Sequence, residues 1–218
     1  MLGPVSSLFG LSDEQAMWRV QVHDDAHAFA RIVQRWEAPI QRLCTRMLND
    51  EQRGEDLTQE TFARLFAKRK EYQVSGRFST YLWRMAVNLC YDELRRRKRR
   101  PESPLEIEQI DRLDDSRGFW LSSPSPDQLL LREEQGQIVR AAVQRLSEAR
   151  RSVVILRHYE NLKFREIAEV LEIPEGTVKS RMAEALHQLH RMLAHTFGNP
   201  KSCLCQTEHQ PMEPSSAP

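Results

Sequence analysis

Residues 161–189 read NLKFREIAEVLEIPEGTVKSRMAEALHQL, and their pattern determines how this part of the chain folds. Apolar residues recur at helical spacing over 164–171, and the period breaks near Pro174 and Gly176 before it resumes. This predicts a short helix, in which the small Ala168 lets a second helix cross closely. The inward residues of the two predicted helices are Ile167, Ala168, Leu171, Val178, Met182, Ala185 and Leu189. Such an arrangement is typical of a helix-turn-helix motif.

The outward face of the second predicted helix carries side chains that suit contact with DNA. In a helix-turn-helix motif, the N-terminal part of this helix enters the major groove. Lysine and arginine reach guanine edges or phosphates, serine contacts either, and glutamate can accept from a cytosine amine. The candidates for DNA contact are Thr177, Lys179, Ser180, Arg181 and Glu184. The alternative interpretation is a helical hairpin whose basic face is simply solvated.

A second informative segment, residues 76–101, reads GRFSTYLWRMAVNLCYDELRRRKRRP and ends in six consecutive basic residues, Arg95–Arg100. Aromatic rings stack on unpaired bases, and arginine and lysine neutralise phosphates. On a helix over 78–100, one stripe offers hydrogen-bonding groups and a ring: Arg84, Asn88, Tyr91, Asp92 and Arg95. This stripe predicts a surface for opened nucleic acid. The alternative is a solvated helix whose basic end suits its own dipole.

An acidic and polar patch precedes that helix in the sequence. Asp56, Gln59 and Glu60 are spaced i, i+3 and i+4, so they share one helix face. Phosphate would be repelled from this patch, and a basic protein partner would fit it. The side chains expected in the core beneath it are Leu57, Phe62, Leu65 and Phe66. The alternative is a charged helix face that contacts only water.

The chain as a whole predicts an all-α fold of two helical domains, because periodic segments of helical length occur and strand patterns do not. In the first domain, a helix near 28–47 should be followed by a turn at 49–54, a helix to about Tyr72 and a loop at 73–77. Four prolines and many acidic residues mark a flexible linker. The expected parts are a leader at 1–12, domains at 13–100 and 127–194, a linker at 101–126, and a disordered tail at 195–218.

Composition excludes several classes of protein. No apolar run approaches the ~20 residues of a membrane span, and no signal-peptide pattern opens the chain. Four cysteines among 218 residues make no disulfide framework, so we expect a cytosolic protein. No catalytic signature is present, so neither an enzyme nor a cofactor is expected. Cys203 and Cys205 are weak candidates for binding a soft metal.

These segments together resemble the bacterial sigma-70 family of RNA polymerase sigma factors, in its short extracytoplasmic-function group. The resemblance covers roughly residues 25–100 and 127–193. It rests on EDLTQETFARLF at 55–66, FSTYLWRMAVNLCYDELRR at 78–96 and LKFREIAEVLEIPEGTVKSRMAEAL at 162–186. In this family the three segments bind the polymerase clamp, melt and read the minus-ten element, and read the minus-thirty-five element.

The resemblance implies roles for individual residues and partners for the chain. Contacts with core RNA polymerase would come from Asp56, Gln59 and Glu60. Contacts with minus-ten promoter DNA would come from Tyr81, Trp83, Arg84, Asn88, Asp92, Arg95 and Arg96, although one of the two aromatic residues could belong to the core. The minus-thirty-five contacts would be Thr177, Lys179, Ser180, Arg181 and Glu184. An anti-sigma factor is a further partner that the resemblance implies.

One rival function stays open at this point. A stand-alone helix-turn-helix regulator would use the C-terminal motif without contacting polymerase. It would leave the acidic patch and the aromatic, basic helix without a role. A regulator should bind duplex promoter DNA tightly by itself, whereas a sigma factor of this group needs polymerase.

Overall fold

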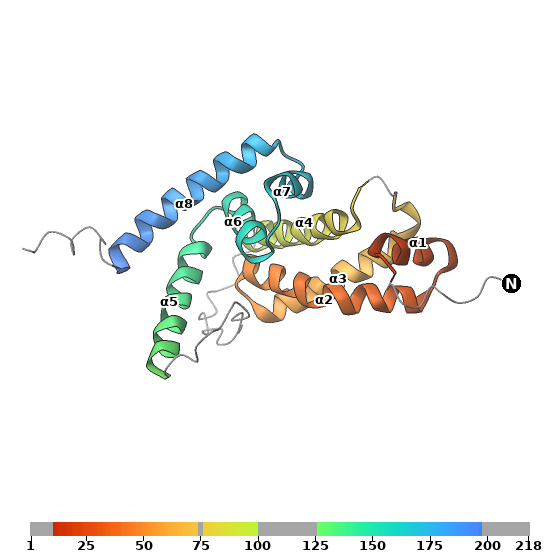
Figure 1. The fold of residues 1–218 in the computed structure, drawn as a ribbon, viewed down its shortest axis with the longest axis horizontal. Coiled ribbons are helices and arrows are strands. Elements are labelled where there is room, and N and C mark those ends of the chain that lie inside the picture. The colour runs from red at the N-terminus through yellow and green to blue at the C-terminus, as the bar shows by residue number, and fades with distance from the viewer. Residues whose placement is uncertain (1–10, 74–75, 100–125, 198–218) are drawn as a thin grey trace, which may run out of the picture.

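The computed structural model describes residues 11–73, 76–99 and 126–197, and none of these residues forms a β-strand. The expected all-α fold is confirmed, with two groups of helices (Figure 1). The first group contains α1 (Asp13–His23), α2 (Ala26–Leu48), α3 (Glu51–Ala67), η1 (Arg69–Glu71) and α4 (Phe78–Arg99). The second contains α5 (Pro126–Gln144), α6 (Glu148–Val154), η2 (Ile155–Tyr159), α7 (Phe164–Leu171) and α8 (Glu175–Phe197). No described helix has the length and hydropathy needed to cross a membrane.

Side-chain caps set the helix boundaries of the first domain. Ser12 and Gln15 form a capping box at the start of α1, and Asp25 accepts backbone hydrogen bonds at the start of α2. Asn49 ends α2 in the left-handed conformation, with φ of 53°, and Asp50 immediately caps α3. The turn is therefore two residues long, and the predicted turn at 49–54 was too long because α3 already begins at Glu51.

Helices α2 and α3 cross closely where Gly54 lies in the first turns of α3. A methyl group on Gly54 would lie 2.3 Å from the Thr45 hydroxyl oxygen and 2.8 Å from the Thr45 backbone nitrogen. The absence of a side chain at this position thus permits the close packing of these two helices. The crossing fixes the position of the acidic patch on α3 relative to α2.

Helix α4 supplies much of the core of the first domain. Its buried residues include Phe78, Leu82, Ala86 and Leu89. The predicted core position of Phe66 is wrong, since its side chain is 38% exposed. Other large side chains that are fully buried in this domain are Met17, Ile32, Ile40, Leu43, Met47 and Leu65.

The second domain contains the predicted helix-turn-helix. Helix α7 has the predicted bounds, and the expected inward residues Val178, Met182 and Ala185 of α8 are buried. The turn is shorter than predicted, because α8 begins at Glu175 and includes Gly176.

The outer boundaries of this domain also differ by a few residues from those expected. Helix α5 begins at Pro126, since proline fits the first position of a helix. Helix α8 continues to Phe197 and so extends into the expected tail. The rest of that tail, most of the linker and the first ten residues lie outside the described residues.

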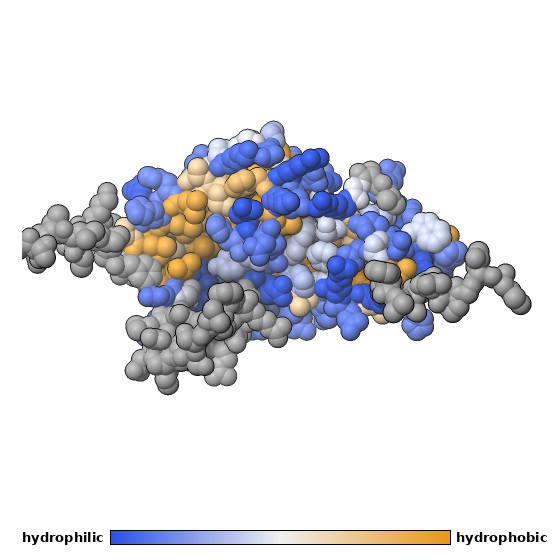
Figure 2. All heavy atoms as spheres, in the orientation of Figure 1, coloured by the Kyte–Doolittle hydropathy of each residue, from blue (hydrophilic) through white to orange (hydrophobic). Residues whose placement is uncertain are grey.

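The two domains pack against one another. Helix α4 lies alongside α7, and α2 contacts α6 and η2 (Figure 1). On the face shown in Figure 2, hydrophilic residues cover most of the first domain, whereas apolar residues gather along α8. The exposed Leu186 belongs to α8.

Candidate functional site

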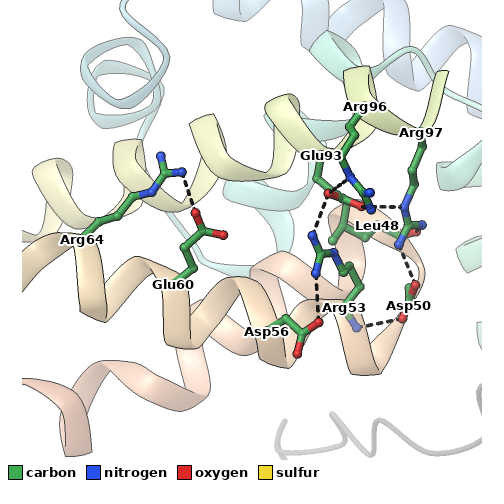
Figure 3. Close-up of polar contacts among 9 residues, drawn as sticks. All are labelled: Leu48, Asp50, Arg53, Asp56, Glu60, Arg64, Glu93, Arg96 and Arg97. Atoms are coloured by element: carbon green, nitrogen blue, oxygen red, sulfur yellow. Dashed lines mark hydrogen bonds and ion pairs between the residues drawn. The ribbon is translucent and has the colours of Figure 1, made fainter. Parts of the chain in front are cut away.

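The acidic patch occupies the outer face of α3. Asp56 and Gln59 are exposed and Glu60 is half-buried, so all three share the face that the helical spacing predicts. Asp56 accepts a hydrogen bond from Arg53 at 3.0 Å, and Glu60 pairs with Arg64 (Figure 3). Both ion pairs are formed between exposed side chains of one helix, so a stronger basic partner can displace them at little cost.

Behind this patch, Arg53 connects α3 to α4 through a buried carboxylate. Arg53 donates to Glu93 at 3.0 Å, and the Glu93 side chain is only 4% exposed (Figure 3). This hydrogen bond raises the pKa of the Arg53 guanidinium above its ordinary value. One guanidinium thus holds both Asp56 of the patch and the carboxylate on the neighbouring helix.

Glu93 also binds two arginines of the basic run that ends α4. Arg96 donates to both Glu93 oxygens at 2.9 Å, and Arg97 donates to one of them at 3.2 Å. The hydrogen bonds from Arg96, Arg53 and Arg97 lower the pKa of Glu93 to about 2 against the opposing effect of burial, the Arg96 contribution being the largest. The sequence interpretation overlooked this residue, although Glu93 lies i+3 and i+4 from two arginines.

The predicted DNA stripe on α4 is partly exposed and partly covered. Asn88, Asp92 and Arg95 are exposed, and Asp92 pairs with Arg95 at 3.2 Å. Arg96 is exposed as well, but Glu93 holds its guanidinium. Arg84 is half-buried and faces the second domain. The residues that remain open on this stripe are therefore near its middle and its C-terminal end.

The two aromatic candidates on α4 lie in different environments. Trp83 is 4% exposed and packs edge-on against Trp36, with 5.7 Å between ring centroids. In this arrangement the Trp83 ring belongs to the core and has no face free for a base, which differs from its expected role. Tyr81 is half-buried beside Tyr72, and burial raises the pKa of its hydroxyl. Alternation around the helix separates these neighbours, since adjacent residues cannot share a face.

The first turns of α8 carry the predicted DNA-reading side chains of the second domain. Lys179, Ser180 and Glu184 are exposed, while Thr177 and Arg181 are half-buried. Three of these side chains already have partners within the domain. Lys179 pairs with Glu175 at 2.7 Å, and the Ser180 hydroxyl donates to the Thr177 carbonyl at 3.0 Å.

Glu184 is engaged by an arginine that the sequence interpretation did not consider. Arg150, in α6, donates to one Glu184 oxygen through two nitrogens, at 2.7 and 3.0 Å. In this arrangement Glu184 orients Arg150 at the surface of the motif and is not free to accept from a base. A basic hollow of Arg145, Arg150, His187 and Arg191 lies beside this pair.

No group of three or more potential metal ligands occurs among the described residues. The candidates Cys203 and Cys205 lie outside that part of the chain. The site therefore consists of charged and polar surfaces on helices, which suits binding of macromolecules.

Comparisons with known proteins identify both domains. Residues 32–100 match the family model for sigma-70 region 2, and residues 136–189 match that for sigma-70 region 4. The chain is 30% identical over 169 residues to the extracytoplasmic-function RNA polymerase sigma factor SigW of Bacillus subtilis, covering 78% of this chain and 90% of the relative. The chain belongs to the sigma-70 family of sigma factors, in its extracytoplasmic-function group.

Two further relatives agree with this assignment. This sigma factor is 31% identical over 182 residues to the RNA polymerase sigma-H factor of Pseudomonas aeruginosa, covering 83% of this chain and 93% of the relative. Its fold is similar to that of the sigma factor RpoE from Bartonella quintana, solved in complex with the anti-sigma factor NepR. That match has a TM-score of 0.59, 20% identity, and covers 76% of this chain and 96% of RpoE.

The family assignment decides between the functions that the sequence left open. This chain is an RNA polymerase sigma factor that directs transcription initiation at promoters, and it is not an enzyme. Core RNA polymerase and promoter DNA are its partners. The acidic patch on α3 and the stripe on α4 both lie within the region 2 match.

Proposed function

We propose that this sigma factor docks on core RNA polymerase through Asp56, Gln59 and Glu60 of α3. The observation that carries the proposal is the placement of these three residues on one outer face of the region 2 domain. Their carboxylates suit a basic polymerase surface, and the ion pairs that occupy them are exposed and exchangeable. Arg53 and Glu93 then connect the docking helix directly to α4.

We infer further that α4 holds the opened minus-ten element while α8 grips duplex DNA upstream. Asn88, Asp92, Arg95 and Arg96 offer the polar and cationic contacts on α4. Tyr81 is the aromatic residue best placed for stacking, since Trp83 is buried. The contacts of α8 come from Thr177, Lys179, Ser180 and Arg181, and Glu184 acts by holding Arg150.

Each DNA surface is modest by itself, and tethering in one chain makes binding by the second surface effectively intramolecular. Polymerase performs the chemistry, and the sigma factor supplies binding energy to capture unpaired bases. We propose that it acts in the cytoplasm, where its polymerase and DNA partners are. An anti-sigma factor is a proposed regulator, supported by the fold likeness to RpoE in its complex with NepR.

Run-off transcription with core polymerase on genomic promoter fragments tests the docking surface. The Asp56→Arg/Glu60→Arg variant should lose at least about tenfold in protein-dependent transcripts, because reversed charges repel a basic partner. Glu37→Arg/Glu134→Arg is the matched control, since both residues are exposed and lie on α2 and α5. Equal activity of the two variants would overturn the proposed docking surface.

The minus-thirty-five surface is tested with a promoter fragment identified in that assay. Lys179→Ala/Arg181→Ala should weaken holoenzyme binding by about tenfold or more and reduce its salt dependence, because two cationic contacts are lost. Arg191→Ala, farther along α8, should change the affinity by less than about twofold. Mobility-shift titration at several salt concentrations gives both quantities. Unchanged affinity of the double variant would remove these residues from the DNA contacts.

A further inference from the structure

The stripe of α4 proposed to bind minus-ten DNA faces helices α6 and α7 of the second domain. The guanidinium of Arg84 pairs with Glu172 at 2.8 Å and donates to the Glu169 carbonyl at 2.6 Å. Farther along α4, the hydroxyls of Tyr91 and Ser152 share a hydrogen bond of 2.7 Å. Two positions of the stripe are therefore already occupied by the chain's own second domain.

Ion pairs continue along both sides of this contact. Before α4, Arg77 pairs with Glu166 of α7. Near the C-terminal end of α4, the Lys98 ammonium lies 2.6 Å from a Glu148 carboxylate oxygen of α6. From α2, Arg46 lies 3.4 Å from a carboxylate oxygen of Glu160, and a second arginine of that helix, Arg42, lies 4.0 Å from the other oxygen.

The sign of the charges is the same in every one of these pairs. The cation comes from the first domain, and the carboxylate comes from the second. Phosphates of a promoter strand would offer negative charge to the same cations. A protein surface that presents carboxylates to a DNA-binding face competes with DNA for that face, since one guanidinium cannot hold both ligands fully.

We propose that the carboxylates of α6 and α7 act as an internal substitute for DNA, so that the free chain closes over its own minus-ten surface. In this closed state Glu148, Glu166 and Glu172 occupy cations that the opened promoter strand needs. The inference rests on the proposed role of α4 in minus-ten binding. It adds a regulatory role for the second domain besides reading duplex DNA.

The closed state also contains contacts that do not depend on paired charges. Arg151 of α6 donates to the Met47 carbonyl at the end of α2, at 2.7 Å, and the Gln144 amide donates to the Arg46 carbonyl at 2.6 Å. These bonds cap the C-terminal carbonyls of α2, which otherwise need water. Because the ion pairs are partly exposed, they exchange readily for phosphates. The contact is therefore suited to reversible opening when polymerase separates the domains.

Zero-length carbodiimide cross-linking of the full chain tests whether this state exists in solution. The Lys98 ammonium and the Glu148 carboxylate are close enough to be joined directly. Mass spectrometry should find the Lys98–Glu148 cross-link in the free protein and lose it when core polymerase is added. The Lys179–Glu175 pair, at 2.7 Å within α8, is the control and should cross-link in both samples. Absence of the first cross-link in the free protein, with the control present, overturns the proposal.

Binding of a short fluorescein-labelled single-stranded DNA, followed by anisotropy without polymerase, tests the competition. Glu166→Gln/Glu172→Gln removes two competing carboxylates and should tighten binding by about fivefold or more. Glu134→Gln/Glu169→Gln is the control with the same change of charge, because neither carboxylate pairs with the first domain. Equal tightening of both variants would show a general charge effect and overturn the proposal.

The two proposals fail in different assays. Loss of the competition effect, together with normal promoter-dependent transcription, removes only the closed state. Failure of transcription with core polymerase removes the proposed function itself.

Discussion

Replacing Glu93 with alanine should lower the free energy of unfolding by about 3 kcal/mol, because one buried carboxylate holds three arginines from two helices. The guanidiniums of Arg53, Arg96 and Arg97 retain some access to water, which limits the loss. Urea titration of the full chain measures the change. Asp92→Ala is the neighbouring control and should cost less than about 1 kcal/mol, since its pair with Arg95 is exposed. Equal costs for the two variants would contradict the proposed role of Glu93.

The contribution of Glu93 should depend on pH in a defined direction. Its pKa is about 2 in the folded chain and 4.5 in its ordinary state, so its stabilising effect is fully present above about pH 4.5. As pH falls through about 2, the folded carboxyl becomes protonated and the effect disappears. The difference in unfolding free energy between wild type and Glu93→Gln should therefore shrink over this interval. A difference that stays constant would mean that the charge of Glu93 is not what stabilises the fold.

Gly54→Ala should also cost about 3 kcal/mol, although alanine normally favours a helix over glycine. The added methyl would meet the Thr45 hydroxyl at 2.3 Å, its backbone nitrogen at 2.8 Å and its α-carbon at 2.9 Å. Rotation of the Thr45 side chain can move only the first of these atoms. Helices α2 and α3 must therefore separate, which would disturb the whole core between them. Thermal and urea unfolding measure the loss.

Two further variants separate backbone crowding from side-chain crowding. Thr45→Ala combined with Gly54→Ala removes the nearest atom but should not restore full stability, since the backbone contacts remain. Gly176→Ala in α8 is the control, because its added methyl would have nothing within 4 Å and should be neutral or slightly stabilising. Full rescue by the Thr45 substitution would show that the backbones do not limit the approach of the two helices.

Local patterns in the sequence predicted the elements and much of each candidate surface. The helix-turn-helix depends on spacing within about thirty residues, so its inward residues Val178, Met182 and Ala185 could be read directly. The shared face of Asp56, Gln59 and Glu60 followed from the same periodicity. The roles of individual side chains at these surfaces stay predictions.

Contacts between distant segments could not be predicted from periodicity. Nothing near Arg84 in the sequence indicates that Glu172 pairs with it, because the two residues come together only when the domains pack. Burial of Trp83 and exposure of Phe66 likewise depend on which helices surround them. The short turn at Asn49 and Asp50 was detectable in principle, since both residue types favour helix ends.

The π-helical turn η2 (Ile155–Tyr159) has a consequence for insertions and deletions. Its wider turn accommodates one more residue than an α-helix would, and Ile155 and Leu156 stay fully buried. At its end, the ring of Tyr159 lies 4.4 Å from the Arg46 guanidinium. Deleting one residue here would restore an ordinary helix and rotate every following side chain by about 100°. The number of residues in this segment, more than their identity, thus determines whether the second domain can meet the first.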